Sequence, residues 1–467
     1  MRLYNTLSGS NEDVVPLSNN TISLYTCGLT VYSQPHVGNW VAYIYWDVLV
    51  RTLRANGFKV NRVQNITDVG HLTSDEDSGE DKMQKGAKRE GLNARQVAEK
   101  YSQIADHEAY SQLGLIRPDH MPRATDYIEQ QIDFVEELER RGYTYKTVDG
   151  IYFDTSKLDN YGELARLDIE GLKSGARIDD TWKKNPTDFA LWKLSDPNEK
   201  RDMEWPSPWG KGFPGWHLEC SVMAREILGD QIDIHTGGID HIPVHHVNEI
   251  AQTESVTEKQ FAKIWIHANH IKVDGKKMSK SVGNIYTLSD ISERGYDIMA
   301  FKLMVLGKHY STEGNFTWNI LESSTNRLSH WKNIAALRWQ ASEDSDSLKD
   351  FFDASRDDIL ASLSDNLSTP EAIAIIERVF DKIENTPRQE LNKRLIEELL
   401  EKIDELLGLD IIGSTPNISD EQRNILNERE AARKSQNWNV SDELRDKLAS
   451  QGVSVKDSAD GQLWGYV

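Results

Sequence analysis

The sequence predicts an α/β protein in which a parallel sheet, split by an insertion, precedes a helical bundle and a small C-terminal module. Residues 23–68 read as strand, helix and strand, and such a βαβ unit requires a parallel sheet covered by helices. From about Ile320 onward almost every periodic segment is helical. The run STPNISDEQ at 414–422 is typical of a linker, and a short module follows it.

Length and composition restrict the class of protein. The chain has 467 residues, enough for about two to four domains. Its 54 basic and 75 acidic residues give a net charge of −21, which argues against coating nucleic acid through bulk charge. Two cysteines exclude a disulfide framework, and no run approaches the roughly 18–20 apolar residues of a membrane helix. The N-terminus has no apolar signal core, so we expect a cytoplasmic protein without a membrane segment.

The predicted sheet begins near the N-terminus. Residues 23–27 form the first expected strand, which ends at Cys27. After Pro35 apolar residues recur on one helical face until Gly57, a typical helix stop. A second strand follows at Lys59–Asp68. Ligands of open α/β sheets bind beyond the carboxyl ends of the strands, so the residues that follow these strands are candidates for a site.

The later elements follow from the same patterns. Residues 71–92 are polar and charged and are predicted to form a mobile loop, with helices at 93–112 and 124–141. Short strands rich in Gly, Pro and Trp between about 145 and 215 predict an insertion with its own core. Sheet-like segments return in QIDIHTGGID and KIWIHANHIKV. The run Lys393–Leu409 has the periodicity expected of a bundle helix.

The first candidate site is PHVGN, placed where a strand turns into a helix. A helix N-terminus presents unpaired N–H groups and positive potential, which suit a phosphate. Gly38 lets a ligand approach the backbone, and His36 and Asn39 could donate hydrogen bonds to phosphate or ribose oxygens. Taken alone, the pentapeptide is better explained by an ordinary N-terminal turn.

The second candidate site is KKMSKS, Lys276 to Ser281, just after a predicted strand. Its three lysines on a loop followed by glycine could neutralise charge that develops on the phosphates of a transferring nucleotide. Taken alone, a solvated basic loop would be the simpler interpretation.

The third candidate site is a metal centre. His245 and Glu249 are four residues apart, so on a helix they share one face. With Cys27 and Cys220 they offer two thiolates, an imidazole and a carboxylate, a set that suits zinc. His246 is a competing imidazole, but it is predicted to point to a different helix face from Glu249. A single cysteine is usually a small buried hydrophobe, yet both cysteines here fall beside other candidate residues.

The fourth candidate site joins Trp216, which stands beside His217 and Cys220, to Thr67 and Asp68 at the end of the second strand. All are predicted to gather at the carboxyl ends of the strands. Packing in the core is an equally good explanation of Trp216.

Together these segments resemble the cysteinyl-tRNA synthetases, a family of class I aminoacyl-tRNA synthetases. The resemblance rests on segments that stand in family order: YTCGLTVYSQPHVGN, QNITDV, NPTDFALWK, WPSPWGKGFPGWHLECSVMA, DIHTGGIDHIPVHHVNEIAQTE, KVDGKKMSKSVGN and STPEA. NEREAARKSQNWNVSDELRDKL also resembles the tRNA-contacting end of the family. The resemblance covers essentially the whole chain, and the motif set that includes both cysteines is highly specific.

The resemblance implies a role for each matching residue. It implies that PHVGN fills the place of the HIGH signature and that 277–281 match KMSKS. The implied catalytic residues are His36, Asn39, Lys277 and Lys280. The implied ATP-binding residues are His36, Gly38, Asn39, Asp240, Lys277 and Lys280. Thr67 and Trp216 are implied to line the cysteine pocket, and Cys27, Cys220, His245 and Glu249 to bind zinc.

The chain departs from the family pattern in three places. Asn39 replaces the second histidine of the HIGH signature, and Val247 stands where many relatives have glutamate. After Asn65–Asp68, a long acidic loop replaces the usual short continuation. The role of that loop is therefore open.

The resemblance also implies six regions. They are the first half of a Rossmann-like catalytic domain (1–120), a connective insertion (121–205), the second half of the catalytic domain with the zinc site (206–255), a stem-contact region that bears KMSKS (256–325), a helical bundle (326–412) and an anticodon-binding module (413–467).

The implied activity joins L-cysteine to tRNA(Cys) with ATP and Mg²⁺, in a monomer that holds one zinc ion. Two alternatives remain open: a ligase that passes cysteine to a small amine, and a non-catalytic zinc-containing RNA-binding protein. In the C-terminal region, Arg429, Arg433 and Lys434 are predicted to share one helical face, with Trp438 and Trp464 available to stack on bases.

Overall fold

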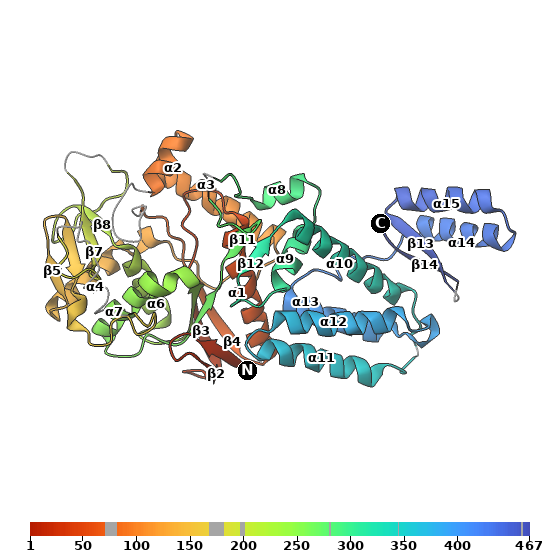
Figure 1. Cartoon of the computed structure of the whole chain (residues 1–467), viewed down its shortest axis with the longest axis horizontal. Helices are drawn as coiled ribbons and strands as arrows, with labels where there is room; N and C mark the ends of the chain where they lie inside the picture. The colour runs from red at the N-terminus through yellow and green to blue at the C-terminus, as the bar shows by residue number, and fades with distance from the viewer. Residues whose placement is uncertain (71–81, 168–181, 197–200, 280–281, 344, 459–460) are drawn as a thin grey trace.

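A computed structural model gives the fold of the chain. It describes residues 1–70, 82–167, 182–196, 201–279, 282–343, 345–458 and 461–467. Within these ranges the molecule is elongated: the insertion lies at one end, the sheet and the bundle in the middle, and the C-terminal module at the other end (Figure 1). No helix in the described ranges is both long and apolar enough to cross a bilayer.

The central sheet has four parallel strands, as the βαβ pattern predicted. Their order is β10-β9-β3-β4, with bounds β3 (Thr21–Thr26), β4 (Lys59–Gln64), β9 (Ile232–Gly238) and β10 (Ala262–Ala268). Helix α1 (Val37–Ala55) connects β3 to β4, and most of its side chains are buried. A hairpin of β1 (Arg2–Asn5) and β2 (Ser10–Asp13) lies beside β10.

Strand register decides which side chains meet at the carboxyl edge of the sheet. Tyr25 pairs with His235, and Thr26 pairs with Thr236, so β3 and β9 end side by side. On the other side of β3, Thr26 pairs with Gln64, the last residue of β4. The segments that leave these strands therefore begin close together although they are far apart in the sequence.

The insertion contains a separate antiparallel sheet. Its order is β5-β6-β7-β8, with bounds β5 (Thr144–Lys146), β6 (Gly150–Phe153), β7 (Phe189–Leu194) and β8 (Gly212–Pro214). Helix α4 (Ile128–Arg140) packs beside it, and its buried residues include Phe134 and Val135. Because β8 pairs with β7, this sheet extends past the predicted insertion boundary at residue 205.

Part of the predicted loop at 71–92 is helical. Residues 71–81 lie outside the described ranges, but α2 (Lys82–Glu90) is a helix that packs against α3 (Ala94–Asp106). The reason is an apolar stripe: Met83 and Ala87, four residues apart, join Val97 and Tyr101 in a small core. The loop prediction is therefore wrong for residues 82–90. The helix predicted at 93–112 is confirmed, with its last turn widened to a π-helical turn (His107–Gln112).

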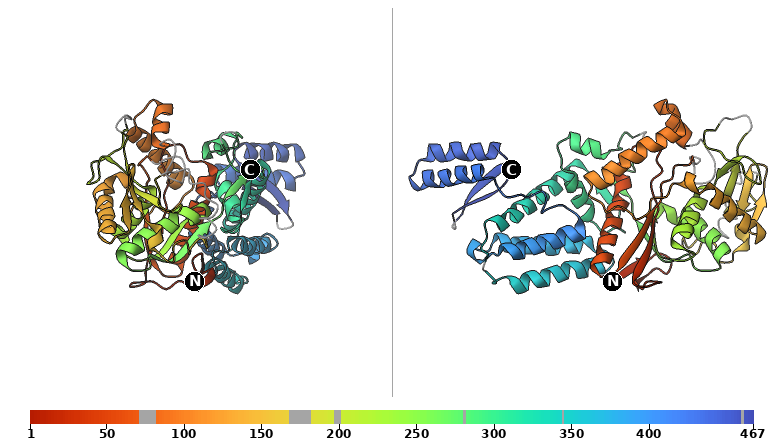
Figure 2. Two further views of the ribbon diagram at one scale, coloured as in Figure 1. Left: turned by 60° about the vertical axis from the view of Figure 1, so that its left-hand side comes forward. Right: turned by 180° about the vertical axis from the view of Figure 1, so that it is seen from behind.

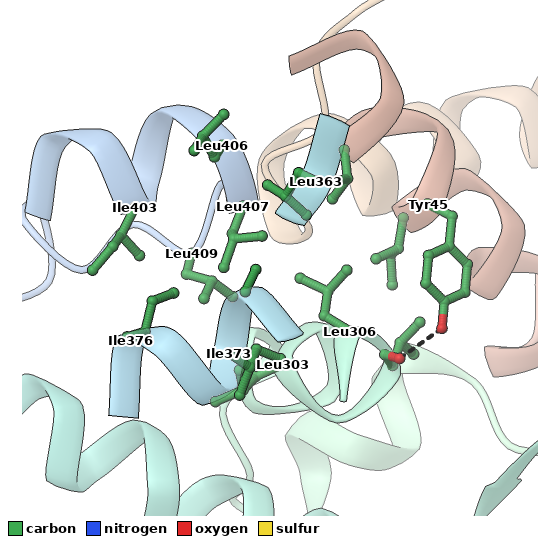
Figure 3. Packing of buried hydrophobic residues seen from close by; sticks show 14 of the residues in the cluster. Tyr45, Leu303, Leu306, Leu363, Ile373, Ile376, Ile403, Leu406, Leu407 and Leu409 are labelled. Carbon is green, nitrogen blue, oxygen red and sulfur yellow. Dashed lines mark hydrogen bonds between the residues drawn. The ribbon is translucent and has the colours of Figure 1, made fainter. Parts of the chain in front are cut away.

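The bundle consists of long amphipathic helices, as predicted. Their bounds are α10 (Trp318–Ala336), α11 (Lys349–Ser364), α12 (Thr369–Glu384) and α13 (Lys393–Leu407). They are joined to the sheet through α8 (Leu288–Glu293), α9 (Ile298–Leu306) and the strand pair β11 (Ile271–Val273) and β12 (Gly314–Phe316). Figure 3 shows Leu303 and Leu306 of α9 packed among side chains of the bundle, close to Tyr45 of α1. The bundle and the sheet thus share one hydrophobic core.

The C-terminal module has its own small core. It contains α14 (Asp420–Lys434), α15 (Trp438–Ser450) and the hairpin β13 (Val453–Ser458) with β14 (Gly461–Tyr466). Ile425, Leu448 and Trp464 are among its buried residues. In the right-hand view of Figure 2 the module lies at the opposite end of the bundle from the central sheet. Its connection to the bundle includes Arg338, whose guanidinium donates hydrogen bonds to the hydroxyl and the carbonyl of Thr415, and Asn333, whose Oδ1 accepts from the N–H of Tyr466.

Candidate active site

A cavity of about 720 Å³ lies at the carboxyl edge of the central sheet. Residues that end or follow each of the four strands line it: Cys27, Thr67, Gly238 and Asn269 are examples. Its volume falls in the range of roughly 300–1,000 Å³ that is usual for small-molecule sites. Ten of the residues singled out in the sequence lie in its wall: Cys27, His36, Gly38, Asn39, Thr67, Trp216, Cys220, Asp240, His245 and Lys277.

The segment PHVGN forms the start of α1, and a side chain of the segment accepts a hydrogen bond from its backbone. The backbone N–H of His36 donates to Oδ1 of Asn39 at 3.0 Å, so only the amide group of Asn39 is left to donate to a ligand. The backbone N–H of Val37 donates to the carbonyl of Tyr286 at 2.8 Å. The first N–H of this helix is therefore already paired, contrary to the expectation of a fully open N-terminus.

The segment around Lys277 lies directly against this helix start. A Cβ added to Gly38 would come 2.1 Å from Cε of Met278, so the absence of a side chain at Gly38 lets the end of Met278 lie against the helix start. Asn284 holds the segment from within: its Oδ1 accepts from the N–H of Ser279, and its amide donates to the carbonyl of Lys277. Lys277 thereby reaches the cavity wall. Lys280 lies outside the described residues.

Asn65 and Thr67 are held by a chain of hydrogen bonds at the end of β4. Oδ1 of Asn65 accepts from the N–H of Gly28 at 2.7 Å, and its amide donates to the hydroxyl of Thr67 at 3.0 Å. Asp68 turns away and accepts two hydrogen bonds from Thr125, one from the backbone N–H and one from the hydroxyl. Thr67 is thus part of the cavity wall, whereas Asp68 secures the following turn.

Trp216 is half-buried and lines the cavity, so it is not simply a core residue. It begins helix α6 (Trp216–Leu228), and its ring centroid lies 4.4 Å from that of His245. Asp240 also lines the cavity but is exposed, in a short turn after β9, with Oδ1 3.9 Å from Nε2 of His270.

The four predicted metal ligands meet, although three separate parts of the chain supply them. Cys27 follows β3, Cys220 lies on α6, His245 lies in a π-helical turn (Ile242–His246), and Glu249 lies on α7 (Val247–Thr257). One ligand atom from each lies within 4.8 Å of the others, and all four residues are buried. Nε2 of His245 and Oε1 of Glu249 are 3.0 Å apart. Two sulfurs, a nitrogen and an oxygen are a donor set that fits a divalent transition-metal ion.

Two of the four groups, Cys220 and Glu249, have pKa values that favour the ionised form a metal needs, whereas burial raises the pKa of the Cys27 thiol well above its usual value. A hydrogen bond from Cys27, with help from His245, lowers the pKa of the Cys220 thiol to about 7. Burial acts to raise the pKa of Glu249, but His235 and His245 outweigh it and lower this pKa to about 2. An anionic carboxylate and a readily ionised thiol therefore face one another before any ion binds.

Two further histidines belong to the same buried region. His246 was predicted to point away from Glu249, and that prediction is wrong: its Nε2 lies 3.8 Å from Oε1 of Glu249. The two residues are three apart on one continuous helical stretch, and residues at that spacing are also neighbours on a helix surface. His235 was not singled out at all, yet its Nε2 lies 2.9 Å from Oε2 of Glu249. The signal for His235 was a polar residue in the middle of a buried strand.

The C-terminal module differs from the expected arrangement. Arg429 is only 1% exposed and forms two hydrogen bonds with the carboxylate of Asp457, so it cannot share an open basic face with Arg433 and Lys434. Trp464 is 4% exposed and belongs to the module core. Trp438, by contrast, is 54% exposed, with the guanidinium of Arg433 5.4 Å from its ring centroid.

Comparison with known proteins identifies the class to which the fold belongs. The family described as "tRNA synthetases class I (C) catalytic domain" matches residues 13–326. Methionyl-tRNA synthetase of Mycobacterium tuberculosis, solved with methionyl-adenylate, has the same fold: the TM-score is 0.61 at 14% identity, over 84% of this chain and 92% of that one. The fold and the cavity therefore define a class I aminoacyl-tRNA synthetase.

The particular family follows from the whole length of the chain. The "Cysteinyl-tRNA ligase anticodon binding domain" matches residues 415–464. Cysteine–tRNA ligase 1 of Burkholderia lata is 41% identical over 99% of this chain and 96% of its own length. Cysteine–tRNA ligase of Treponema denticola is 36% identical over 99% of each chain. The chain belongs to the cysteinyl-tRNA synthetase family.

Proposed function

We propose that the chain joins L-cysteine to tRNA(Cys) in two steps. In the first step the carboxylate of cysteine attacks the α-phosphate of ATP and pyrophosphate leaves. In the second a hydroxyl of the terminal ribose attacks the carbonyl carbon and AMP leaves. Neither step needs a protein nucleophile, so the chain contributes alignment and charge stabilisation.

One observation carries this proposal: nucleotide and amino-acid candidates line a single cavity. His36 and Lys277 lie in the same wall as Cys27, Cys220 and Trp216. His36 and Lys277 are suited to hold phosphates, and Lys280 is proposed to join them, while Mg²⁺ would arrive with ATP. Thr67 and Trp216 would hold the amino acid at the other end.

Selection of cysteine is proposed to depend on the metal cluster. Cysteine differs from serine by sulfur in place of oxygen, a change too small for shape alone to reject strongly. A zinc ion held by Cys27, Cys220, His245 and Glu249 would offer a position that a thiolate occupies far better than a hydroxyl. The buried cluster fits such an ion in donor type and number.

The C-terminal module supports tRNA as the acceptor in place of a small amine. It carries the match to an anticodon-binding domain, and Trp438 presents an exposed aromatic surface beside Arg433. Aromatic and guanidinium groups of this kind stack on unpaired bases.

The test is charging of total tRNA with each labelled amino acid in turn, before and after removal of metal by a chelator. We expect cysteine alone to be charged, loss of charging after chelation, and recovery with added zinc. Charging of another amino acid in preference to cysteine would contradict the assignment. Transfer of cysteine to small amines without tRNA would support the rival ligase.

A further inference from the structure

A second set of potential metal ligands overlaps the first. Cys27, His235, His246 and Glu249 each place one donor atom within 4.8 Å of the others, and all four are buried. Two of these residues, Cys27 and Glu249, also belong to the first set. The two that differ, His235 and His246, replace Cys220 and His245.

The distances in the second set are close to those of a four-coordinate site. Ligand bonds of about 2.0–2.3 Å in a tetrahedron place donor atoms roughly 3.3–3.8 Å apart. Nε2 of His246 is 3.4 Å from Sγ of Cys27 and 3.8 Å from Oε1 of Glu249. Sγ of Cys27 is 3.9 Å from the same Oε1. For these three donors, shifts of a few tenths of an ångström would suffice for coordination, and a donor atom of His235 lies within 4.8 Å of them.

The surroundings of His246 are those of a metal ligand. Its Nδ1 lies 2.7 Å from Nε2 of His267, and Nδ1 of His267 lies 2.7 Å from the hydroxyl of Thr6. Metal-binding histidines usually engage such a partner through the nitrogen that does not bind the metal. The chain of contacts thus fixes the His246 ring with Nε2 directed at Cys27 and Glu249.

Glu249 stands between the two sets. Its Oε1 faces His245 at 3.0 Å, whereas its Oε2 faces Nε2 of His235 at 2.9 Å. The strand pairing that places His235 beside Tyr25 fixes that histidine on the far side of the carboxylate. The carboxylate of Glu249 therefore contacts a histidine of each set, and its Oε1 also lies near Cys27 and His246.

We propose that the chain has a second, overlapping position for a divalent metal ion, formed by Cys27, His235, His246 and Glu249. Because the two positions share two ligands, only one is occupied at a time. One sulfur, two nitrogens and one oxygen form a donor set that binds Zn²⁺ and Co²⁺. An ion in this position would leave Cys220 and His245 free. The proposal concerns metal binding alone and does not depend on which amino acid the enzyme activates.

The test uses Co²⁺ alone with the full-length chain, because thiolate-to-cobalt absorption reports how many sulfurs bind the ion. The variant Cys220→Ser/His245→Asn removes the ligands that only the first set uses. We expect it to bind one Co²⁺ per chain, with about half the thiolate absorption of the unsubstituted protein. The matched variant His235→Asn/His246→Asn should bind one Co²⁺ with the full two-thiolate absorption.

The decisive comparison is between Cys220→Ser/His245→Asn and a variant that carries two further substitutions. Adding His235→Asn and His246→Asn to Cys220→Ser/His245→Asn should abolish cobalt binding. Absence of Co²⁺ from a folded Cys220→Ser/His245→Asn variant, at concentrations that saturate the unsubstituted protein, would overturn the proposal. It would mean that His235 and His246 only orient Glu249. If the double variant does not fold, the single variant Cys220→Ser replaces it. We expect Cys220→Ser to keep the cobalt absorption of one thiolate and to lose it when His246→Asn is added. Cobalt absorption that persists in Cys220→Ser/His246→Asn would contradict the second position.

Discussion

Asp47 shows how a single buried charge can join two parts of this molecule. Its carboxylate accepts hydrogen bonds from Nε of Arg51, from Nζ of Lys302 and from the backbone N–H of Ile116. Lys302 also donates to the carbonyl of Gly408, at the end of the bundle helix α13. Asp47 and Lys302 are both fully buried, so neither charge has water as an alternative partner. The pair therefore ties α1, which begins at PHVGN, to the helical bundle.

The first prediction concerns that pair. Asp47→Asn should lower the free energy of unfolding by about 3–5 kcal/mol, because it leaves the Lys302 ammonium buried without a counter-charge. Asp47→Asn/Lys302→Met should cost clearly less than the sum of the two single variants. Urea unfolding measures all three, and strict additivity would contradict the coupling described here.

The second prediction gives the same pair a pH dependence. Burial acts to raise the pKa of Asp47, but Lys302 and Arg51 outweigh it, and the pKa lies below its usual value. A carboxyl whose pKa is lower in the folded state contributes stability above its unfolded pKa of about 4 and loses it as the pH falls through the folded pKa. The stability difference between the unsubstituted protein and Asp47→Asn should therefore be constant near neutrality and shrink below about pH 4. A difference that grows with acidification would refute this account.

At the scale of elements, local patterns predicted most of the secondary structure, and pairing across the chain decided the rest. The βαβ unit and the bundle follow from apolar periodicity. The helix at 82–90 was missed because its short stripe, Met83 and Ala87, gains stability only from packing on α3. His235 acquires its place from the pairing of β9 with β3, which no local pattern contains. Residue type and family resemblance were enough to choose the first metal set, Cys27, Cys220, His245 and Glu249. They did not indicate the overlapping set that contains His235 and His246.

The third prediction tests the contact between α1 and the Lys277 segment. Gly38→Ala should displace Met278 and with it Lys277, and a shift of about 1 Å can lower a rate by about 100-fold. Cysteine-dependent ATP–pyrophosphate exchange measures the effect, and Met278→Ala in the same chain should restore part of it.

A matched control is Gly307→Ala at the end of α9, where an added Cβ would come no closer than 3.3 Å to other atoms. It should leave exchange nearly unchanged. Equal losses from the two glycine variants would show that the contact with Met278 does not matter.

At the scale of the whole molecule, the C-terminal module and the sheet are joined by a long helical bundle (Figure 1). The core of the module is distinct from the core that the bundle shares with the sheet, although it includes Ala336 of α10. Because of this division, removing the module should leave the cavity intact. Arg338 and Thr415, which anchor the connection, should stay in the truncated chain so that no buried guanidinium loses its partner.

The fourth prediction follows from this division. A chain that ends at Ile418 should keep cysteine-dependent ATP–pyrophosphate exchange within about twofold, because the site of activation is unchanged. It should lose most aminoacylation of tRNA(Cys), because the contacts between the module and the tRNA are lost. Trp438→Ala in the full chain should reproduce part of that loss, because stacking on a base is worth about 1–3 kcal/mol. Unchanged aminoacylation by the truncated chain would contradict a tRNA-binding role for the module.

X-ray absorption at the zinc edge tests most directly whether a buried ion takes the sulfur of the substrate. The purified, zinc-loaded protein would be measured alone, with cysteine, and with serine. The account predicts that the number of sulfur neighbours of the ion rises by one with cysteine and does not change with serine. The same number of sulfur neighbours with cysteine as without it would contradict the proposal that the metal selects the amino acid.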